Sequence, residues 1–144
     1  MQYAARAGTT TAYYWGDNID DGCAYENIAD QSMKNIRGLA DEPAANCDDG
    51  FAHTAPVGSF KPNPWGFYDI LGNVAVWTED CYIGNYRNAP KDGSAVTAGD
   101  CAMRAAYGGS WRQPPRYVRA AARAAREPNN RIFWLGVRLV RIPP

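Results

Sequence analysis

Four cysteines, Cys23, Cys47, Cys81 and Cys101, are the side chains best suited to redox or soft-metal chemistry. Their wide spacing contains no Cys-x-x-Cys pair of the kind that binds zinc or exchanges thiols. Pairing in chain order would close two loops of about 20 residues, each contributing roughly 3 kcal/mol in the chain-entropy model. Four reduced thiols are the alternative. The even count favours two disulfides and, with them, an extracellular, cell-surface or periplasmic location.

Other catalytic groupings are missing from the sequence. His53 is the only histidine, so a site with several imidazole ligands cannot be assembled. Glu79 and Asp80 are adjacent on a segment expected to be extended, so their side chains point in different directions and form no matched acid–base pair. Ser110 lies outside any Gly-x-Ser-x-Gly turn. The residues by themselves therefore build no known active site.

Charge is distributed unevenly along the chain although its net value is zero. Residues 1–103 hold 14 acidic residues against six basic ones, whereas residues 104–144 hold nine arginines against the single Glu127. Two interpretations remain open: an anion-binding face, or arginines that pair with acidic loops of the same domain. A nucleic-acid partner is not expected, because net basic charge and a known recognition motif are both lacking.

The elements that must position these residues are short. Gly (14) and Pro (10) are frequent, and no apolar run approaches the roughly 20 residues of a membrane span. Residues 16–64 read as loop, with a helical turn or two within 24–36. Strands are predicted over 74–77, 106–111 and 135–142. Residues 116–126 are undecided, since their alanines favour a helix and their alternation favours a strand.

Three stretches carry a specific resemblance: TAPVGSFKPNPWGFYDILGNVAVWTEDCY (54–82), YGGSWRQPPRYVRAAAR (107–123) and LGVRLVR (135–141). They resemble the C-terminal portion of the formylglycine-generating enzyme family, also called the sulfatase-modifying factor family. The opening YAARAGTTTAYYWGD (3–17) resembles the middle of the family domain. We therefore expect residues 1–144 to form one such domain that lacks its N-terminal part.

The resemblance implies an α+β, C-type lectin-like fold of the formylglycine-generating enzyme subtype. Such a fold is loop-rich around a small, mostly antiparallel sheet, in agreement with the glycine and proline content. The resemblance also turns the interpretation of residues 117–123 toward a strand, because tertiary context often overrides intrinsic propensity.

The enzymatic chemistry of the family is not supported by the residues present. Its cysteine-oxidising members bind copper through two cysteines just after the Gly-Gly-Ser segment, and here no cysteine follows Cys101. An iron-dependent branch uses several histidines, and here only His53 exists. Copper and iron are therefore not expected, and we favour a catalytically inactive, lectin-like ligand-binding domain. The alternative is a formylglycine-generating-enzyme-like oxidoreductase or accessory enzyme with an unidentified site.

Calcium is the cofactor that the resemblance implies. Family members bind it through positions that correspond here to side-chain oxygens of Asn27 and Asp49 and backbone carbonyls of Ile28 and Phe51. The alternative is that Asn27 and Asp49 only cap turns. A second family calcium site would use Asp69, but the glutamate that completes it is replaced by Val76, so this site is expected to be empty or weakened.

The segment RIFWLG (131–136) places apolar residues where the family pattern is mostly polar. This arrangement resembles the variable proteins of diversity-generating retroelements, which bind a protein or other cell-surface ligand through C-terminal loops. We expect an exposed patch for such a ligand. An ordinary family member whose 132–134 segment packs against its own domain is the alternative. The corresponding ligand-binding candidates are Arg112, Gln113, Pro114, Tyr117, Ala122, Ala124, Arg126, Ile132, Phe133 and Trp134.

Overall fold

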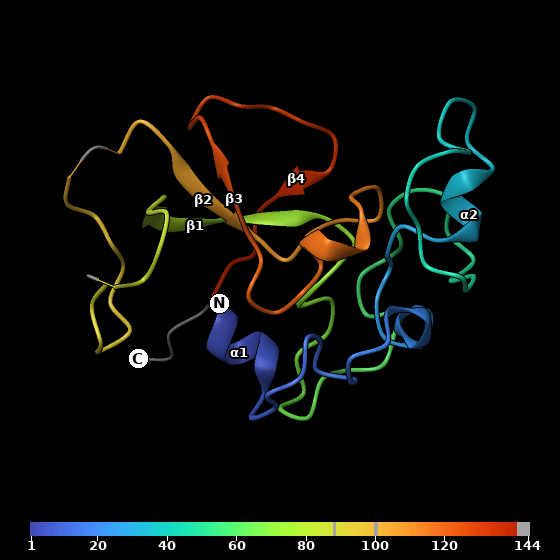
Figure 1. Ribbon diagram of the computed structural model, residues 1–144, viewed down its shortest axis with the longest axis horizontal. Helices are drawn as coiled ribbons and strands as arrows, with labels where there is room; N and C mark the ends of the chain where they lie inside the picture. Colours follow the sequence, from blue (N-terminus) through green and yellow to red (C-terminus); the bar gives the residue numbers. More distant parts are fainter. Residues whose placement is uncertain (88, 100, 141–144) are drawn as a thin grey trace.

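Regular secondary structure is sparse in the computed structural model, which describes residues 1–87, 89–99 and 101–140. Figure 1 shows the strands gathered at one end and the coil of residues 16–64 at the other. No helix in these described ranges has the length and apolar character to cross a membrane. The helices are α1 (Gln2–Arg6), the 3-10 helix η1 (Ile19–Ala24), α2 (Gln31–Lys34) and the 3-10 helix η2 (Pro115–Tyr117).

The strands form one four-stranded sheet in the order β3-β2-β1-β4. They are β1 (Ala75–Cys81), β2 (Arg104–Tyr107), β3 (Arg123–Arg126) and β4 (Leu135–Gly136). β2 runs antiparallel to both β1 and β3, and β4 runs parallel to β1. This loop-rich α+β architecture with a mostly antiparallel sheet confirms the expected fold class.

Glycine geometry ends β2 earlier than the sequence suggests. The predicted strand over 106–111 is formed only up to Tyr107, because Gly108 and Gly109 have φ values of 97° and 69°. A Cβ atom on Gly109 would lie 2.9 Å from the Tyr117 carbonyl oxygen, so the two segments can approach this closely only with glycine here. The strand predicted over 74–77 is confirmed as the start of β1.

Two other strand predictions are wrong in extent. Residues 117–123 are not a strand: Pro115 opens η2, and the Val118 and Ala122 amides close local turns, so β3 starts only at Arg123. The pair Pro114-Pro115 contributes no N–H groups to a sheet. The strand predicted over 135–142 is reduced to β4, while residues 141 and 142 lie outside the described residues.

The core joins the loop-rich end to the sheet. The larger cluster packs Ile28 from the coil against Leu71, Val76 of β1 and Tyr107 of β2. A second cluster packs Met33 of α2 against Trp111. Most of the buried residues in these two clusters therefore lie outside the strands.

Both predicted disulfides form, Cys23 with Cys47 and Cys81 with Cys101. The first closes the loop that carries α2. The second closes the segment between β1 and β2. Cross-linking these segments limits the freedom of the unfolded chain, which compensates for a small core.

Removing the first disulfide tests this argument. We expect the double substitution Cys23→Ser and Cys47→Ser to lower the free energy of unfolding by roughly 3 kcal/mol, because the unfolded chain regains the entropy of the open loop. Urea denaturation followed by tryptophan fluorescence measures the change. An unchanged midpoint and slope relative to the parent protein would contradict a stabilising role for this bond.

Candidate functional site

The first candidate site lies where two loops of the coil meet, at Asn27 and Asp49. The Asp49 carboxylate accepts hydrogen bonds from the backbone N–H groups of Ile28 (3.0 Å) and Phe51 (2.8 Å). The structure therefore brings Asp49 into contact with Ile28 and Phe51, and Asn27 adjoins Ile28 in the chain. The contact between Asp49 and the Ile28 amide fixes the distance between the two loops.

Asn27 is fully buried, and the nitrogen and oxygen of its side-chain amide differ in their hydrogen bonding. Its Nδ2 group donates to the carbonyl oxygen of His53 (2.8 Å) and to Oδ1 of Asn73 (3.3 Å). Its Oδ1 atom is buried and has no hydrogen-bond partner. A buried amide oxygen without a partner is unfavourable by about 1–3 kcal/mol unless something else binds it.

The donor set fits a hard cation. The unpartnered Asn27 amide oxygen and the Asp49 carboxylate are oxygen groups of the kind that Ca²⁺ prefers. Burial raises the pKa of the Asp49 carboxyl group to about 7, with the neighbouring Asp30 charge adding to the effect. A cation bound beside this group would stabilise its ionised form and so lower that pKa.

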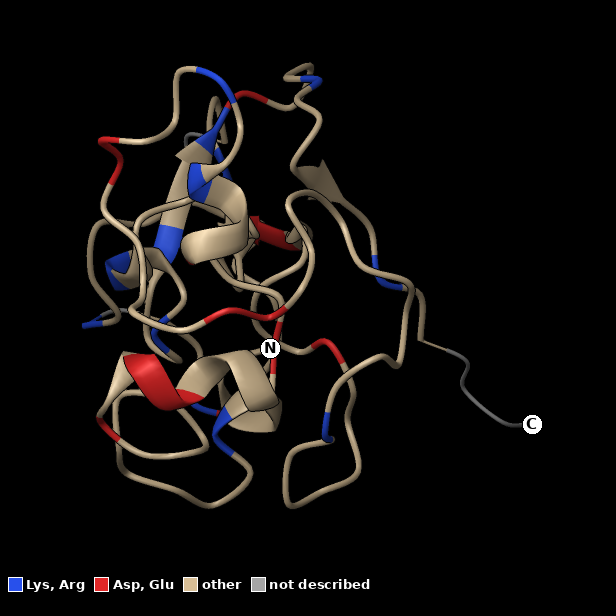
Figure 2. Ribbon diagram, turned by 90° about the vertical axis from the view of Figure 1, so that its right-hand side faces the viewer, with Lys and Arg blue, Asp and Glu red and all other residues tan. Residues whose placement is uncertain are grey.

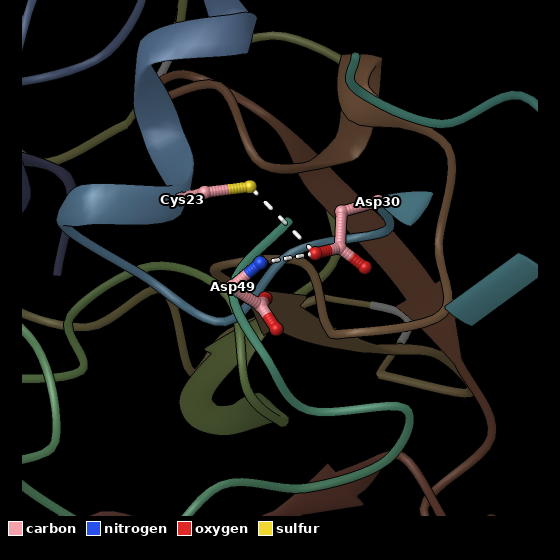
Figure 3. Close-up of side chains that lie close together, drawn as sticks. All are labelled: Cys23, Asp30 and Asp49. Atoms are coloured by element: carbon pink, nitrogen blue, oxygen red, sulfur yellow. Dashed lines mark hydrogen bonds between the residues drawn. The ribbon is translucent and has the colours of Figure 1, made fainter. Parts of the chain in front are cut away.

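A neighbouring cluster, Cys23, Asp30 and Asp49, is not a second metal centre. Its potential ligand atoms lie within 4.8 Å of one another, but the Cys23 sulfur is bonded to Cys47 and offers no thiolate. Figure 3 shows that Asp30 faces the backbone N–H of Asp49, while the Asp49 carboxyl group points away from it. Asp30 also accepts from the Met33 amide and so caps α2. Its role is structural.

The second calcium position of the family is built differently. Asp69 accepts a hydrogen bond from the Gly58 amide (2.7 Å) through one oxygen, and the other oxygen is buried without a partner. Val76, which stands where the family has glutamate, is buried in the main core. An apolar side chain supplies no ligand, so this site has lost one of its anionic donors.

The C-terminal candidates lie around a tight turn over residues 132–135, closed by the Leu135 N–H donating to the Ile132 carbonyl (3.0 Å). Such a turn sends successive side chains in different directions. Phe133 is 67% exposed, whereas Trp134 is only 9% exposed. The expectation that both side chains lie on the surface is therefore wrong for Trp134.

Gln113 is also buried, at 9% exposure, which contradicts its expected place in an exposed patch. Its backbone N–H donates to the Ser110 carbonyl (3.2 Å), and its side chain lies against the Ser110 hydroxyl, so the chain folds back on itself at this point. Arg112, Pro114, Tyr117, Ala122, Ala124, Arg126 and Ile132 are half-buried.

Arginine–aromatic contacts connect two pairs of these candidates. The Arg126 guanidinium lies 5.1 Å from the centre of the Trp134 ring, and that of Arg112 lies 5.6 Å from the centre of the Phe133 ring. Gln113, Tyr117, Ala122 and Ala124 line one shallow depression beside the same strand, β3. We call the surface formed by the ten candidates the C-terminal patch.

Sequence reasoning missed two contributors near this surface. Arg104 of β2 lies directly opposite Arg126 of β3 in the sheet register. On the far side of β3, Arg123 lies over the Tyr86 ring at 3.9 Å. Side chains three residues apart in a strand leave opposite faces of the sheet, so Arg123 and Arg126 point in opposite directions. The sequence could not show this, because it did not reveal where β3 begins and ends.

The comparisons with known proteins agree on a family. The model of the sulfatase-modifying factor enzyme 1-like domain matches residues 1–143. A formylglycine-generating enzyme of Mycobacterium tuberculosis is 31% identical over 152 residues, with 99% of this chain and 48% of the relative covered. An inactive C-alpha-formylglycine-generating enzyme 2 of Bos taurus is 37% identical over 112 residues, with 76% of this chain and 29% of the relative covered. The chain spans less than half the length of these relatives.

Solved structures share the fold. PvdO from Pseudomonas aeruginosa superposes with a TM-score of 0.75 at 32% identity, with 94% of this chain and 47% of that chain covered. The Treponema denticola variable protein 1 superposes with a TM-score of 0.72 at 25% identity, with 94% and 42% covered. Both likenesses extend over the loops as well as the small sheet.

The raised pKa of Asp49 predicts a pH-dependent stability in the absence of cations. Between its ordinary pKa of 3.8 and about 7, the folded protein holds a proton that the unfolded chain releases. The free energy of unfolding should therefore fall as pH rises through this range, by roughly 1 kcal/mol after allowance for partial exposure. Urea denaturation at pH 5 and pH 8 in a chelator measures it.

Asp49→Asn is the matched variant, because it keeps the size of the side chain and removes the titration. The difference in unfolding free energy between the two pH values should be smaller in this variant than in the parent protein. Added calcium should stabilise the parent at pH 8 and have little effect at pH 5, where the proton competes with it. Equal pH dependence in both proteins would contradict the assignment to Asp49.

Proposed function

Because the chain belongs to the sulfatase-modifying factor enzyme 1-like family, we propose that it is a catalytically inactive, lectin-like domain that binds a ligand through its C-terminal patch. The state of the cysteines carries this proposal. All four are bonded in disulfides, and none follows Cys101, so no thiolate is available for copper. The family framework is thus present without its soft-metal ligands.

The inactive relative and the variable protein support this reading. One is named as an inactive formylglycine-generating enzyme, and the other as a variable protein of the same fold. Among the candidates for diversification, Phe133 is 67% exposed, so its substitution would change a ligand contact without disturbing the core. We therefore propose a variable protein of the diversity-generating retroelement type. Its ligand would be a protein or another cell-surface molecule.

Calcium serves as a structural ion in this proposal. Asn27, Ile28, Asp49 and Phe51 would hold it, and it would bind the amide oxygen that is otherwise buried without a partner. Binding would tie together the two loops that the Cys23–Cys47 disulfide already constrains. The disulfides also support an extracellular, cell-surface or periplasmic location, since such bonds persist in oxidising compartments.

An enzymatic function is the alternative, because relatives at about 31% identity are named formylglycine-generating enzymes. Purified protein would be assayed for oxygen consumption with a cysteine-containing sulfatase peptide, with and without added copper or iron. Metal-dependent turnover would overturn the proposal of an inactive domain. A reverse transcriptase and a near-copy of the gene's end beside the gene would support the variable-protein reading, and their absence would remove it.

Phe133 is the side chain on which ligand binding should depend most. Exposed aromatic rings bury a large area on binding, so Phe133→Ala should weaken binding of selected peptides at least tenfold, with little change in stability. Binders are selected from a phage-displayed library of random linear peptides and measured by fluorescence anisotropy. Tyr3→Ala is the control, because Tyr3 is exposed but lies on α1, away from the patch. Equal loss in both variants would contradict the proposed surface.

A further inference from the structure

The arginines of the C-terminal segment are not neutralised within the molecule. Of the nine arginines that follow residue 103, eight lie in the described part of the chain. Within that part, none forms an ion pair with a carboxylate: those with contacts donate to backbone or sulfur atoms or lie over aromatic rings. Figure 2 shows where the basic and acidic residues lie along the ribbon. Pairing with acidic loops, one of the two interpretations of the charge pattern, is therefore not what the described residues do.

Two of these arginines face each other across the sheet. Arg104 and Arg126 are Cα partners on neighbouring antiparallel strands, so their side chains leave the same face of the sheet. Like charges placed directly opposite are destabilising. Arg104 donates to the Glu79 carbonyl (2.7 Å) and Arg126 to the Ala125 carbonyl (2.9 Å), contacts that leave their positive charges uncompensated. An anion from outside the molecule would relieve this repulsion.

The aromatic rings hold two guanidinium groups in place on the patch. Arg126 lies over Trp134, and Arg112 lies over Phe133, the residue that precedes Trp134 in the chain. A guanidinium that lies over a ring still has N–H groups at its edge that can donate to a carboxylate, and Arg126 uses only one of its five on the Ala125 carbonyl. Ordering of these long side chains by stacking also reduces the entropy lost on binding.

We propose that the C-terminal patch binds an acidic peptide segment of a partner protein, with carboxylates at Arg112 and Arg126 and apolar side chains against Phe133. This inference rests on the proposed ligand-binding function and names its ligand class. A peptide fits better than a nucleic acid or another polyanion. The apolar Ile132 and Phe133 adjoin the arginines, and the whole chain has zero net charge, so long-range attraction to a polyanion is weak.

The test uses the composition of the peptides selected from the random library. We expect enrichment of Asp and Glu beside apolar residues, and binding that weakens with added salt. In a selected peptide synthesised with Asn and Gln in place of Asp and Glu, binding should be lost. Arg112→Gln and Arg126→Gln should each lower the affinity for the acidic peptide roughly tenfold, as expected when one charge-assisted contact is removed.

Arg37→Gln is the control, since it removes the same charge from an exposed position outside the patch and should leave binding unchanged. Equal losses in all three variants would reduce the effect to net charge and overturn the proposal. Phe133-dependent peptides without acidic enrichment would overturn it while leaving the ligand-binding function intact. An absence of Phe133-dependent binders would overturn both. If polyuridylate or heparin bound more tightly than the selected peptides, and this binding depended on Arg126, the ligand would be a polyanion and the proposal of an acidic peptide would be overturned.

Discussion

The contact on which the architecture depends most is the approach of the coil backbone at Asn27 to the turn before β1. The Asn73 N–H donates to the Asn27 carbonyl at 2.7 Å, and a Cβ atom on the preceding Gly72 would lie 2.4 Å from that oxygen. Only glycine allows this distance. The Asn73 side chain forms hydrogen bonds with both the N–H and the carbonyl of Ala55. The backbone carbonyl of Asn73 accepts a hydrogen bond from the Trp111 amide. One turn thus joins three loops that share no regular structure.

A buried acid lies beside this junction. Glu26 accepts hydrogen bonds from the Tyr14 hydroxyl (3.0 Å) and the Leu71 amide (3.1 Å), and burial raises the pKa of its carboxyl group well above the usual range. A neutral, protonated carboxyl group here avoids a buried unpaired charge while still accepting both hydrogen bonds. Position 26 therefore contributes to the packing of the coil against the turn through hydrogen bonds, whereas the oxygens proposed to bind a cation belong to the loops that follow.

The sequence predicted the parts of the fold that depend on composition and chain order, and it failed where local geometry decides. Loop content, both disulfides and the start of β1 follow from glycine, proline, cysteine and β-branched residues. The extent of β2 and β3 does not, because two glycines with positive φ and two consecutive prolines end or delay those strands. In the C-terminal patch, ring contacts link Arg126 with Trp134 and Arg112 with Phe133, but Gln113 and Trp134 are buried rather than exposed. The orientation of Trp134 was unpredictable, since it depends on a turn closed by a single hydrogen bond between the Leu135 amide and the Ile132 carbonyl.

That turn explains how one short segment can both stabilise the fold and present a changeable surface. The Trp134 carbonyl accepts from the Ala75 amide and its indole is buried, so this residue anchors the loop to β1. Phe133 projects outward from the same turn; its ring centre lies 6.0 Å from that of Trp111 and 5.6 Å from the Arg112 guanidinium. Replacing an outward side chain leaves the anchor intact. A surface built on alternating anchored and free positions can therefore tolerate sequence change at the free ones, and the framework needs neither a metal-binding thiolate nor a long strand to hold it.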